Sequence, residues 1–261
     1  MGTSSLQGRI VWITGASSGI GAIAARMLAE QGAVPVLTAR SESKLREAAG
    51  AIRGEHAIYP LDVRDATAAC DVAARIVQRF GRIDALVNNA GYGEFVPFDE
   101  APLSHFEEMM DVNYMGIVRC CKAVLPLMRQ AGQGHIVNVA SLAGKIGTAK
   151  ATGYAASKHA VLGFTNSLRQ ELRGTGIRIS AVNPGPIDTP FFDRADPGGT
   201  YKRNIRHFLM KPDKPARAIV SVIASGRAEI DLPWASAVGT KLVQLFPRLT
   251  DGIAARLLNK K

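Results

Sequence analysis

The chain has 261 residues, of which 47% are apolar, and a formal net charge of +10. This length favours one large domain and is enough to bury a full α/β core, while the apolar fraction argues against disorder. No apolar run reaches the length of a membrane span, and the polar start Met1–Gln7 shows no signal-peptide pattern. The positive charge includes no block that resembles a recognition helix or a basic arm, so we expect no nucleic-acid partner.

Three cysteines, Cys70, Cys120 and Cys121, have a spacing that fits neither a metal site nor a disulfide framework. Two of them are adjacent within a segment of helical pattern. We therefore expect core residues in a reducing compartment, which predicts a cytoplasmic protein without a bound metal.

Short apolar runs alternate with longer helical patterns along nearly the whole chain. The short runs show little polar alternation, as expected of strands covered on both faces. Glycines follow several helical patterns at the position of a C-cap. This alternation predicts a doubly wound parallel sheet in a single α/β domain over residues 1–261. The predicted strands are Arg9–Thr14, Val34–Thr38, His56–Pro60, Ile83–Asn88, His135–Ala140, Ile177–Asn183 and Glu229–Trp234, and the predicted helices are Gly19–Gln31, Ser43–Ile52, Ala66–Phe80, Leu103–Arg129 and Gly153–Arg173.

The segment Thr14–Gly21, Thr-Gly-Ala-Ser-Ser-Gly-Ile-Gly, lies between the first predicted strand and the first predicted helix. Its glycines allow a tight turn and a close approach of the backbone to a pyrophosphate. The N-terminus of the following helix then presents free N–H groups to the phosphate charge. An ordinary Gly/Ser turn looks similar in isolation, but the position between strand and helix favours a dinucleotide site of the Rossmann type.

Arg40 stands just after the second predicted strand. In NAD-binding folds an acidic residue about 20 positions past the glycines binds the ribose 2′-hydroxyl. No acid occupies that position here, whereas the Arg40 guanidinium can pair with a 2′-phosphate in a forked geometry. The alternative is a solvated arginine that pairs with Glu42. We expect NADP(H) as the cofactor in preference to NAD(H).

Further motifs follow the glycine turn in order along the chain. They are Asn-Asn-Ala-Gly at Asn88–Gly91, Asn113 on the long predicted helix, Ser141 after the fifth strand, YxxxK at Tyr154 and Lys158, and Asn-Pro-Gly at Asn183–Gly185 with Thr189 beyond. With the TGxxxGxG pattern of the first turn, the chain resembles the short-chain dehydrogenase/reductase family over about residues 7–225. The resemblance implies a Rossmann fold and a nicotinamide-dependent oxidoreductase that forms a homo-oligomer.

The candidate catalytic residues are chemically suited to proton transfer. Tyr154 and Lys158 are four residues apart and share a helix face. A phenol with a pKa of about 10 is a poor acid–base catalyst at neutral pH, and a nearby ammonium would lower that pKa. Ser141 would bind the substrate oxygen. The alternatives are an ordinary exposed helical pair and a strand-end serine.

The resemblance also assigns roles to particular residues. Lys158 would reach the nicotinamide ribose, and Asn113 would link Lys158 to solvent through a helix kink and a bound water. The alternative for Asn113 is a helix residue that bonds to a neighbouring backbone. The implied cofactor contacts are Gly15, Ser17, Ser18, Gly19, Ile20, Gly21, Arg40, Asp62, Val63, Asn89, Ala90, Gly91, Tyr154, Lys158, Pro184, Gly185, Ile187 and Thr189.

Residues 190–212 follow the Pro-Gly motif and contain the apolar runs Phe191–Phe192 and Phe208–Met210. We expect an apolar, mobile substrate lid here. The basic residues in this segment and just after it, from Lys202 to Arg217, either attract an acidic substrate or acyl carrier or, as is more common, form a solvated face.

The end of the chain departs from the family pattern, and residues 235–261 predict a helical extension broken at Pro247. Apolar residues such as Leu242 and Leu257 are accompanied there by basic ones such as Lys241. Such a stripe either makes weak contact with an anionic membrane surface or, more commonly, packs on its own domain or a partner subunit. The departure puts the usual tetramer in doubt, so a dimer and a tetramer both stay open.

The leading hypothesis is an NADP(H)-dependent enzyme that interconverts a small ketone or aldehyde and an alcohol by hydride transfer. The alternatives are a 3-oxoacyl thioester reductase and a nonenzymatic NADP(H)-sensing protein. A sensor needs only the cofactor contacts, so the complete set of catalytic candidates argues against it.

Overall fold

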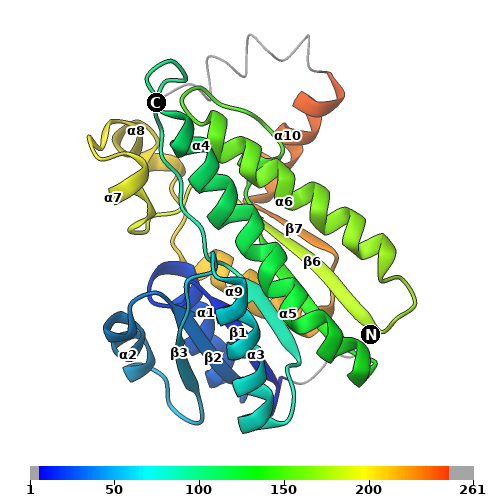
Figure 1. Cartoon of the computed structure of the whole chain (residues 1–261). Helices are drawn as coiled ribbons and strands as arrows, with labels where there is room; N and C mark the ends of the chain where they lie inside the picture. Colours follow the sequence, from blue (N-terminus) through cyan, green and yellow to red (C-terminus); the bar gives the residue numbers. More distant parts are fainter. Residues whose placement is uncertain (1–5, 247–261) are drawn as a thin grey trace.

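The computed structural model describes residues 6–246, in which seven strands form one parallel sheet in the order β3-β2-β1-β4-β5-β6-β7 (Figure 1). Short β-branched runs covered on both faces account for this sheet. The prediction of a doubly wound α/β fold is confirmed. The strands are β1 Ile10–Thr14, β2 Val34–Ala39, β3 Ala57–Pro60, β4 Ala85–Asn88, β5 Gly134–Val139, β6 Ile177–Pro184 and β7 Glu229–Leu232.

The strand order reverses at β1, which pairs with β2 on one side and with β4 on the other. In such sheets ligands bind beyond the carboxyl ends of the strands at the reversal. The turns that follow β1 and β4 flank this point, and they contain the glycine turn and the Asn-Asn-Ala-Gly motif.

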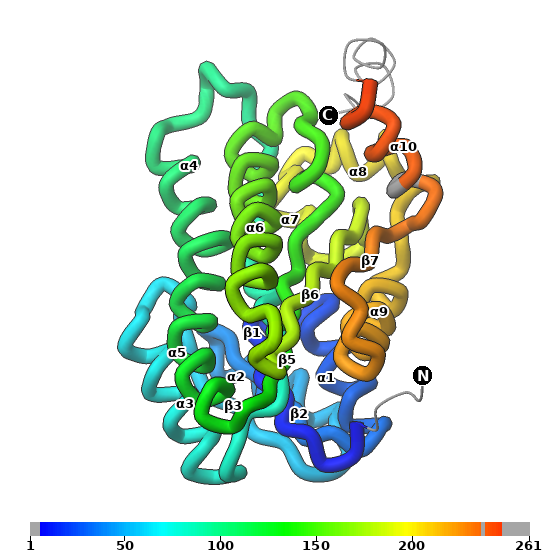
Figure 2. The backbone as a smooth tube through the Cα atoms, turned by 90° about the vertical axis from the view of Figure 1, so that its right-hand side faces the viewer, coloured from blue at the N-terminus to red at the C-terminus, as the bar shows by residue number. Residues whose placement is uncertain are grey.

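Helices cover both faces of the sheet (Figure 2). On one face lie α3 Ala66–Phe80, α5 Gly116–Ala131 and α6 Thr152–Glu171, and on the other lie α1 Gly19–Glu30, α2 Glu42–Gly50 and α9 Asp213–Ser225. Helix α9 goes beyond the predicted elements, although Ile219, Val222 and Ile223 recur at the spacing of a helix face.

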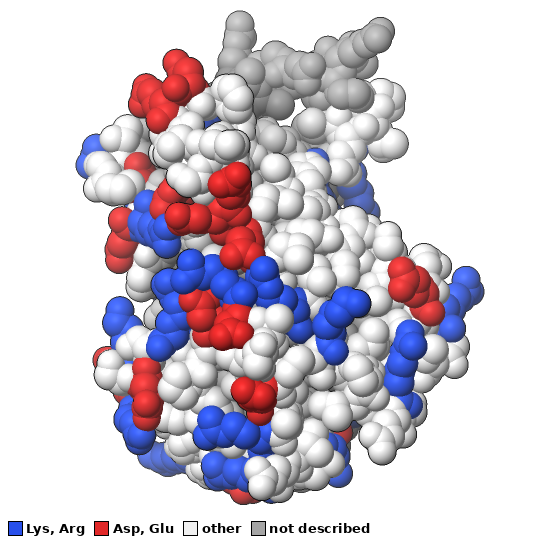
Figure 3. Space-filling view, viewed as in Figure 1, with Lys and Arg blue, Asp and Glu red and all other residues white. Residues whose placement is uncertain are grey.

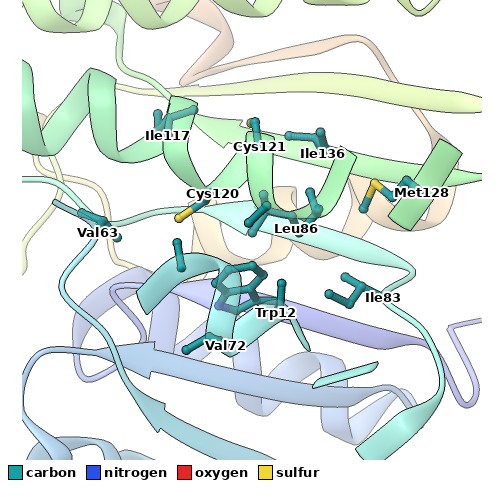
Figure 4. Close-up of a cluster of buried hydrophobic side chains, with 14 of the residues drawn as sticks. Trp12, Val63, Val72, Ile83, Leu86, Ile117, Cys120, Cys121, Met128 and Ile136 are labelled. Carbon is teal, nitrogen blue, oxygen red and sulfur yellow. The ribbon is translucent and has the colours of Figure 1, made fainter. Parts of the chain in front are cut away.

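The core between the sheet and α3 and α5 is closely filled (Figure 4). Trp12 is fully buried there, and its indole N–H donates to the Thr38 hydroxyl at 2.9 Å. Cys120 and Cys121 pack in the same cluster, where burial raises the pKa of both thiols. Cys70 is exposed on the outer face of α3, so its predicted place in the core is wrong, because the buried face of α3 runs through Ala69, Val72, Ala73 and Ile76.

The long helix predicted over Leu103–Arg129 is divided into α4 Leu103–Met110, a π-helical turn at Asp111–Met115 and α5. The π turn is the point at which Asn113 makes hydrogen bonds to two other segments. The regular α-helical hydrogen bonds are interrupted there by a π turn, and such turns are frequent at functional sites.

After the last strand the chain forms α10 Trp234–Leu245, which begins at Trp234 and thus takes this residue out of the predicted strand. The predicted break at Pro247 and the helix expected after it lie outside the described residues. Among helices of the described region, none is long and apolar enough to cross a membrane.

His135 is a fully buried imidazole on β5. The Ser180 hydroxyl donates to the carbonyl of Arg227 at 2.7 Å, so Nε2 of His135 donates to Ser180 Oγ, also at 2.7 Å. Burial, followed by the charges of Arg178 and Arg9, lowers the pKa of His135 to about 3.

We expect this histidine to make the fold acid-sensitive. Its folded pKa is lowered, so below pH 6.5 the unfolded chain binds a proton that the folded chain does not, and stability falls as pH falls towards 3. From pH 6.5 to 5 the loss amounts to about 2 kcal/mol. Urea unfolding at several pH values would show this loss in the parent protein and not in His135→Gln. The exposed His207→Gln is the control, and parallel pH profiles for all three proteins would contradict the prediction.

Candidate active site

A polar junction joins the turns that follow β1 and β4. The Thr14 hydroxyl accepts the backbone N–H groups of Asn89 and Ala90, each at 3.1 Å. The Asn89 side-chain amide donates back to the carbonyls of Thr14 and Gly15 at 3.1 and 3.0 Å. The Asn89 amide nitrogen is thus used within the protein, and these hydrogen bonds hold the two turns together.

The glycines of the first turn are required by the packing of the protein itself, and not only by a ligand. Gly15 has a φ of +64°, and a Cβ atom on it would lie 2.8 Å from the Ala90 Cα. A Cβ on Gly21 would lie 2.6 Å from the Asn89 amide nitrogen. Helix α1 begins at Gly19 with no acidic residue in its first turn and no side-chain cap from Ser18. Its first N–H groups are therefore available to an anion.

Around this turn, Ser17 and Ile20 are half-buried and Ser18 is exposed. A Cβ on Gly19 would lie 3.7 Å from the Thr189 side chain, so the segment after β6 reaches the glycine turn. Gly19 and Thr189 are far apart in the sequence, and the fold brings them together at the glycine turn.

Arg40 is exposed directly after β2, next to β1 in the sheet. Glu42 pairs with Arg46 instead, so the pairing considered for Arg40 does not form. Asp62 is held by Arg64 at 2.7 Å, and this hydrogen bond lowers the pKa of the Asp62 carboxyl, against burial and with help from the charge of Arg40. Arg40 and Asp62 therefore lie at the same end of the crevice.

Val63 is buried beside Asp62 and faces the helix that carries Asn113. A Cβ on Gly116 would lie 2.7 Å from a Val63 methyl carbon, so the helix approaches this segment closely.

Ser141 follows β5, and its hydroxyl donates to the carbonyl of Pro184 at 3.2 Å and accepts the N–H of Ala143 at 3.0 Å. It also hydrogen-bonds the Tyr154 hydroxyl, from α6. Ser141 and Tyr154, which were predicted to be catalytic from separate motifs, are thus in direct contact.

Lys158 lies one turn after Tyr154 on α6 and is buried. Its ammonium donates to the carbonyl of Val139 at 3.0 Å and lies 5.8 Å from the centre of the Tyr154 ring. Burial lowers the pKa of Lys158 to about 8. Burial raises the pKa of Tyr154 to about 12, and the hydrogen bond with Ser141 opposes it only in part. The expected lowering of the Tyr154 pKa by Lys158 is therefore not seen, because desolvation of both groups dominates.

Asn113 joins three segments from the π turn. Its amide donates to the carbonyl of Tyr92 at 2.8 Å and to the Ser157 hydroxyl at 3.0 Å, and its oxygen accepts the N–H of Tyr92 at 2.9 Å. A Cβ on Gly91 would lie 2.9 Å from the Asn113 oxygen and 3.5 Å from Nζ of Lys158. Asn113, Gly91 and Lys158 are therefore neighbours. Tyr92 and Ser157 carry no signal of their own in the sequence beyond their places next to the motifs.

The segment after β6 closes the crevice. Gly185 donates its N–H to the carbonyl of Leu232 at 2.7 Å. Ile187 pairs with Met210, and Met210 donates its N–H to the carbonyl of Pro186 at 3.0 Å. The chain between these points is a loop whose two ends are fixed together.

That loop is the predicted lid, and it folds as α7 Phe191–Ala195, α8 Thr200–Asn204 and a 3-10 turn at Arg206–Phe208. Its small core consists of Phe192, Ala195 and Ile205. The ring of Phe191 lies 5.5 Å from that of Tyr154, and Phe95 packs at 6.3 Å from the same ring. Phe191 of this segment and Phe95 therefore place aromatic side chains against Tyr154.

The basic residues of the lid are partly used within the protein. Lys202 pairs with Asp188 at 2.9 Å, and Arg194 pairs with Glu94 at 2.6 Å. Arg203 donates to Gly198 and Thr200 of its own helix region. A surface hollow between segments 94–96 and 193–197 is lined by none of the four catalytic candidates.

A charged cluster supports the loop that carries Ser141. The Lys145 ammonium donates to both oxygens of Asp231 at 2.7 Å and pairs with Glu229, both on β7. Asn183, which precedes Pro184, donates to the same two carboxylates at 2.7 Å. Burial alone would lower the pKa of Lys145, but the two carboxylates raise it above its ordinary value.

We expect Lys145→Met to destabilise the protein by about 2 kcal/mol, because it leaves two neighbouring carboxylates without their cation in a partly buried place. Urea unfolding would measure the loss. Lys145→Arg should restore most of it, and the exposed Lys122→Met on α5 is the control. A loss no larger than that of the control would show that the cluster is not needed.

Comparison with known proteins places this site in a family. Residues 9–198 match the family described as short chain dehydrogenase. An uncharacterized oxidoreductase of Staphylococcus saprophyticus is 40% identical over 201 residues, which cover 76% of this chain and 86% of the relative. A putative ketoacyl reductase of the monensin polyketide synthase from Streptomyces virginiae is 41% identical over 195 residues, which cover 73% of this chain and 75% of the relative.

Solved structures with a similar fold come from the same family. A short-chain dehydrogenase/reductase from Burkholderia phymatum in complex with NAD superposes with a TM-score of 0.87 at 26% identity, covering 94% of this chain and 96% of that one. The closed form of a serine dehydrogenase with NADP+ gives 0.80 at 30% identity, covering 85% and 94%. The chain belongs to the short-chain dehydrogenase/reductase family of oxidoreductases.

Proposed function

We propose that the protein is an NADP(H)-dependent oxidoreductase that interconverts a ketone or aldehyde and the corresponding alcohol. In the direction of reduction, a carbonyl compound, NADPH and a proton give an alcohol and NADP+. The observation that carries the proposal is the convergence of Ser141, Tyr154 and Lys158 beside the crevice at the β1/β4 reversal.

The residues present suit a dinucleotide cofactor, which would supply the hydride when bound. The uncapped start of α1 would hold its pyrophosphate. Gly91, which has no side chain to block the approach to Lys158, and Thr189 would border its nicotinamide half. This assignment also draws on the family relatives that bind NAD or NADP+.

Tyr154 would be the proton donor in reduction. Its pKa of about 12 keeps the phenol protonated at neutral pH, so the phenol would have a proton to donate to the carbonyl oxygen. Ser141 would hydrogen-bond the same oxygen and hold it in place. Lys158, positively charged below a pKa of about 8, would stabilise the phenolate that remains.

Arg40 supports NADP(H) in preference to NAD(H). It is exposed at the end of β2 and free of the Glu42 pairing, so its guanidinium can meet a 2′-phosphate. The residues after β2 include no acid at the position that would bind a ribose 2′-hydroxyl.

The substrate side of Tyr154 is apolar. Phe191 and Phe95 face the tyrosine ring, which favours a substrate with an aromatic or aliphatic group next to its carbonyl. A 3-oxoacyl thioester is a second candidate, supported by the Streptomyces virginiae relative. The internal pairing of Lys202 weakens the argument that a basic lid attracts an acyl carrier. NADPH oxidation measured against ketones, aldehydes, steroids, sugars and acyl thioesters would separate these classes.

We also place the protein in the cytoplasm, on the support of three free cysteines. A nonenzymatic sensor is disfavoured by the internal order of the site, because Asn113 and Ser141 are held by hydrogen bonds that cofactor binding alone would not need.

Tyr154→Phe removes the phenolic proton and leaves the ring packing intact. We expect turnover to fall by about 100-fold or more, because general acid catalysis is lost. The dissociation constant for NADPH, measured by fluorescence titration, should change little. Appreciable turnover in this variant would contradict the mechanism, whereas loss of NADPH binding would show a structural role instead.

Arg40→Asp replaces the proposed phosphate ligand with a repelling charge. We expect the KM for NADPH to rise by about 10- to 100-fold, which corresponds to the loss of a charge-assisted hydrogen bond, and the KM for NADH to stay similar or fall. Arg53→Asp, at an exposed position just after α2, makes the same charge change and is the control. Equal effects of Arg40→Asp on both cofactors would exclude the 2′-phosphate role.

A further inference from the structure

Arg194 of α7 joins the lid to the loop that follows β4. Its guanidinium carbon lies 3.6 Å from the centre of the Tyr92 ring, and its Nε donates to a Glu94 oxygen at 2.6 Å. Next to these contacts, the Phe95 N–H donates to the carbonyl of Ala195 at 3.0 Å. Helix α7 therefore lies directly against this loop, beside the segment that leads from β4 to α4 (Figure 1).

The two partners of Arg194 are fixed by segments outside the lid. The second oxygen of Glu94 accepts a hydrogen bond from Nδ1 of His105 at 2.9 Å, and His105 is buried on α4. The backbone N–H and carbonyl of Tyr92 are both bonded to the Asn113 side chain in the π turn. The contacts of Arg194 thus hold α7 to a loop that α4 and the π turn keep in place.

The residues that alternate with the two partners of Arg194 contact the aromatic rings of the site instead. A Cβ atom on Gly93 would lie 2.7 Å from Cζ of Phe191 and 3.0 Å from a ring carbon of Tyr154, so a larger side chain does not fit there without a shift. The Phe95 ring lies 6.3 Å from that of Tyr154 and 6.4 Å from that of Phe191. One short segment therefore contacts both Arg194 and the rings around the proposed proton donor.

The position of Phe191 depends on how α7 is held. Phe191 lies three residues before Arg194, and residues with this spacing share one side of a helix. Its ring lies 5.5 Å from the Tyr154 ring. Any movement of α7 away from the loop after β4 would therefore carry Phe191 away from Tyr154.

The shape of the guanidinium matters more here than its charge. The Arg194 side chain is 46% exposed, and ion pairs at such positions contribute little by themselves. Acidic and basic side chains also lie next to one another on the α7 side of the molecule (Figure 3), so a positive charge alone does not distinguish this residue. A planar guanidinium can stack on Tyr92 and donate to Glu94 at the same time, which an ammonium does less well.

We propose that Arg194 is a positioning residue, which anchors α7 to the loop after β4 and holds Phe191 against Tyr154. The apolar side of the substrate site is then formed before a substrate binds. A preformed surface lowers the cost of binding, because the ring does not have to be ordered at that moment. The effect on substrate binding rests on the function proposed above, whereas the anchoring of α7 does not.

Hydrogen–deuterium exchange of the full-length protein without substrate tests the anchoring. Arg194→Met removes both contacts and keeps a long side chain. We expect the amides of residues 191–196 and of Phe95 to exchange about tenfold faster or more, because local opening becomes easier. Arg206→Met is the control, since Arg206 is exposed in the same lid and bonds to its neighbour His207. Equal exchange in the two variants would overturn the proposal.

Two further variants separate an anchor from a general loss of stability. Arg194→Lys keeps the charge without the planar group and should recover only part of the protection. If the contacts of Arg194 act as one unit, Arg194→Met/Glu94→Gln should exchange no faster than Arg194→Met alone. Additive effects of the two changes would contradict a shared anchor, and unfolding curves check that every variant is folded.

Kinetics with acetophenone and acetone test the consequence for substrate binding. Acetophenone carries an aromatic ring next to its carbonyl, where Phe191 would contact it, whereas acetone has only methyl groups. We expect Arg194→Met to raise the KM for acetophenone by about three- to tenfold and that for acetone by less than about twofold, with similar kcat values. Equal changes for both ketones would overturn the role of Phe191 in substrate binding. If the parent protein reduces neither ketone, the substrate assignment fails, and the exchange experiment alone still decides whether Arg194 anchors α7.

Discussion

The site depends first on a small polar junction, the pairing of Thr14 with Asn89. A doubly wound sheet opens a crevice where its strand order reverses, but the pairing of β1 with β4 ends before the two turns that flank this point. Here one hydroxyl and one amide join the two turns, through four hydrogen bonds between the ends of β1 and β4. The glycines follow from this close approach, because a Cβ on Gly15 or Gly21 would collide with the opposite turn. The shape that suits a dinucleotide is thus a consequence of the protein's own packing.

Burial sets the charge states around the catalytic candidates. The lid brings Phe191 against Tyr154, and desolvation then favours the neutral phenol, while the same desolvation weakens the hold of Lys158 on its proton. A protonated tyrosine next to an ammonium that stays charged at neutral pH is the pair needed to donate a proton to a carbonyl oxygen. The packing of this segment against Tyr154 and the acidity of Tyr154 are therefore linked. Because both ends of the lid are fixed at Pro186–Asp188 and Met210, movement of the segment between them would alter this desolvation without disturbing the sheet.

The sequence was sufficient to predict those parts of the fold in which a local pattern has one physical cause. Buried strands, helix caps and the glycine turn each follow from residue type and spacing, and the parallel order of the sheet follows from their alternation. Tyr154 and Lys158 were identified by position, but the pKa of Tyr154 was not, since it depends on Phe191 and on burial supplied by distant segments. The break at Asp111–Met115 likewise arises from bonds between Asn113, Tyr92 and Ser157, which no local periodicity records. The prediction that Cys70 is a core residue was wrong because its position on the outer face of α3, and not its residue type, decides its exposure.

The edge strand β7 connects the catalytic loop with the end of the chain. Lys145 comes four residues after Ser141, and it bonds through its ammonium to β7 and through its carbonyl to Gln244 of α10. Asn183 bonds to the same carboxylates and immediately precedes Pro184, which accepts the Ser141 hydroxyl. Hydrogen bonds of Lys145 therefore join the Ser141 loop to both β7 and α10. An edge strand ordinarily needs protection from pairing with other chains, and here charged side chains on β7 and a following helix provide it. The same charges position the serine, so protection of the sheet edge and precision of the site have one structural origin.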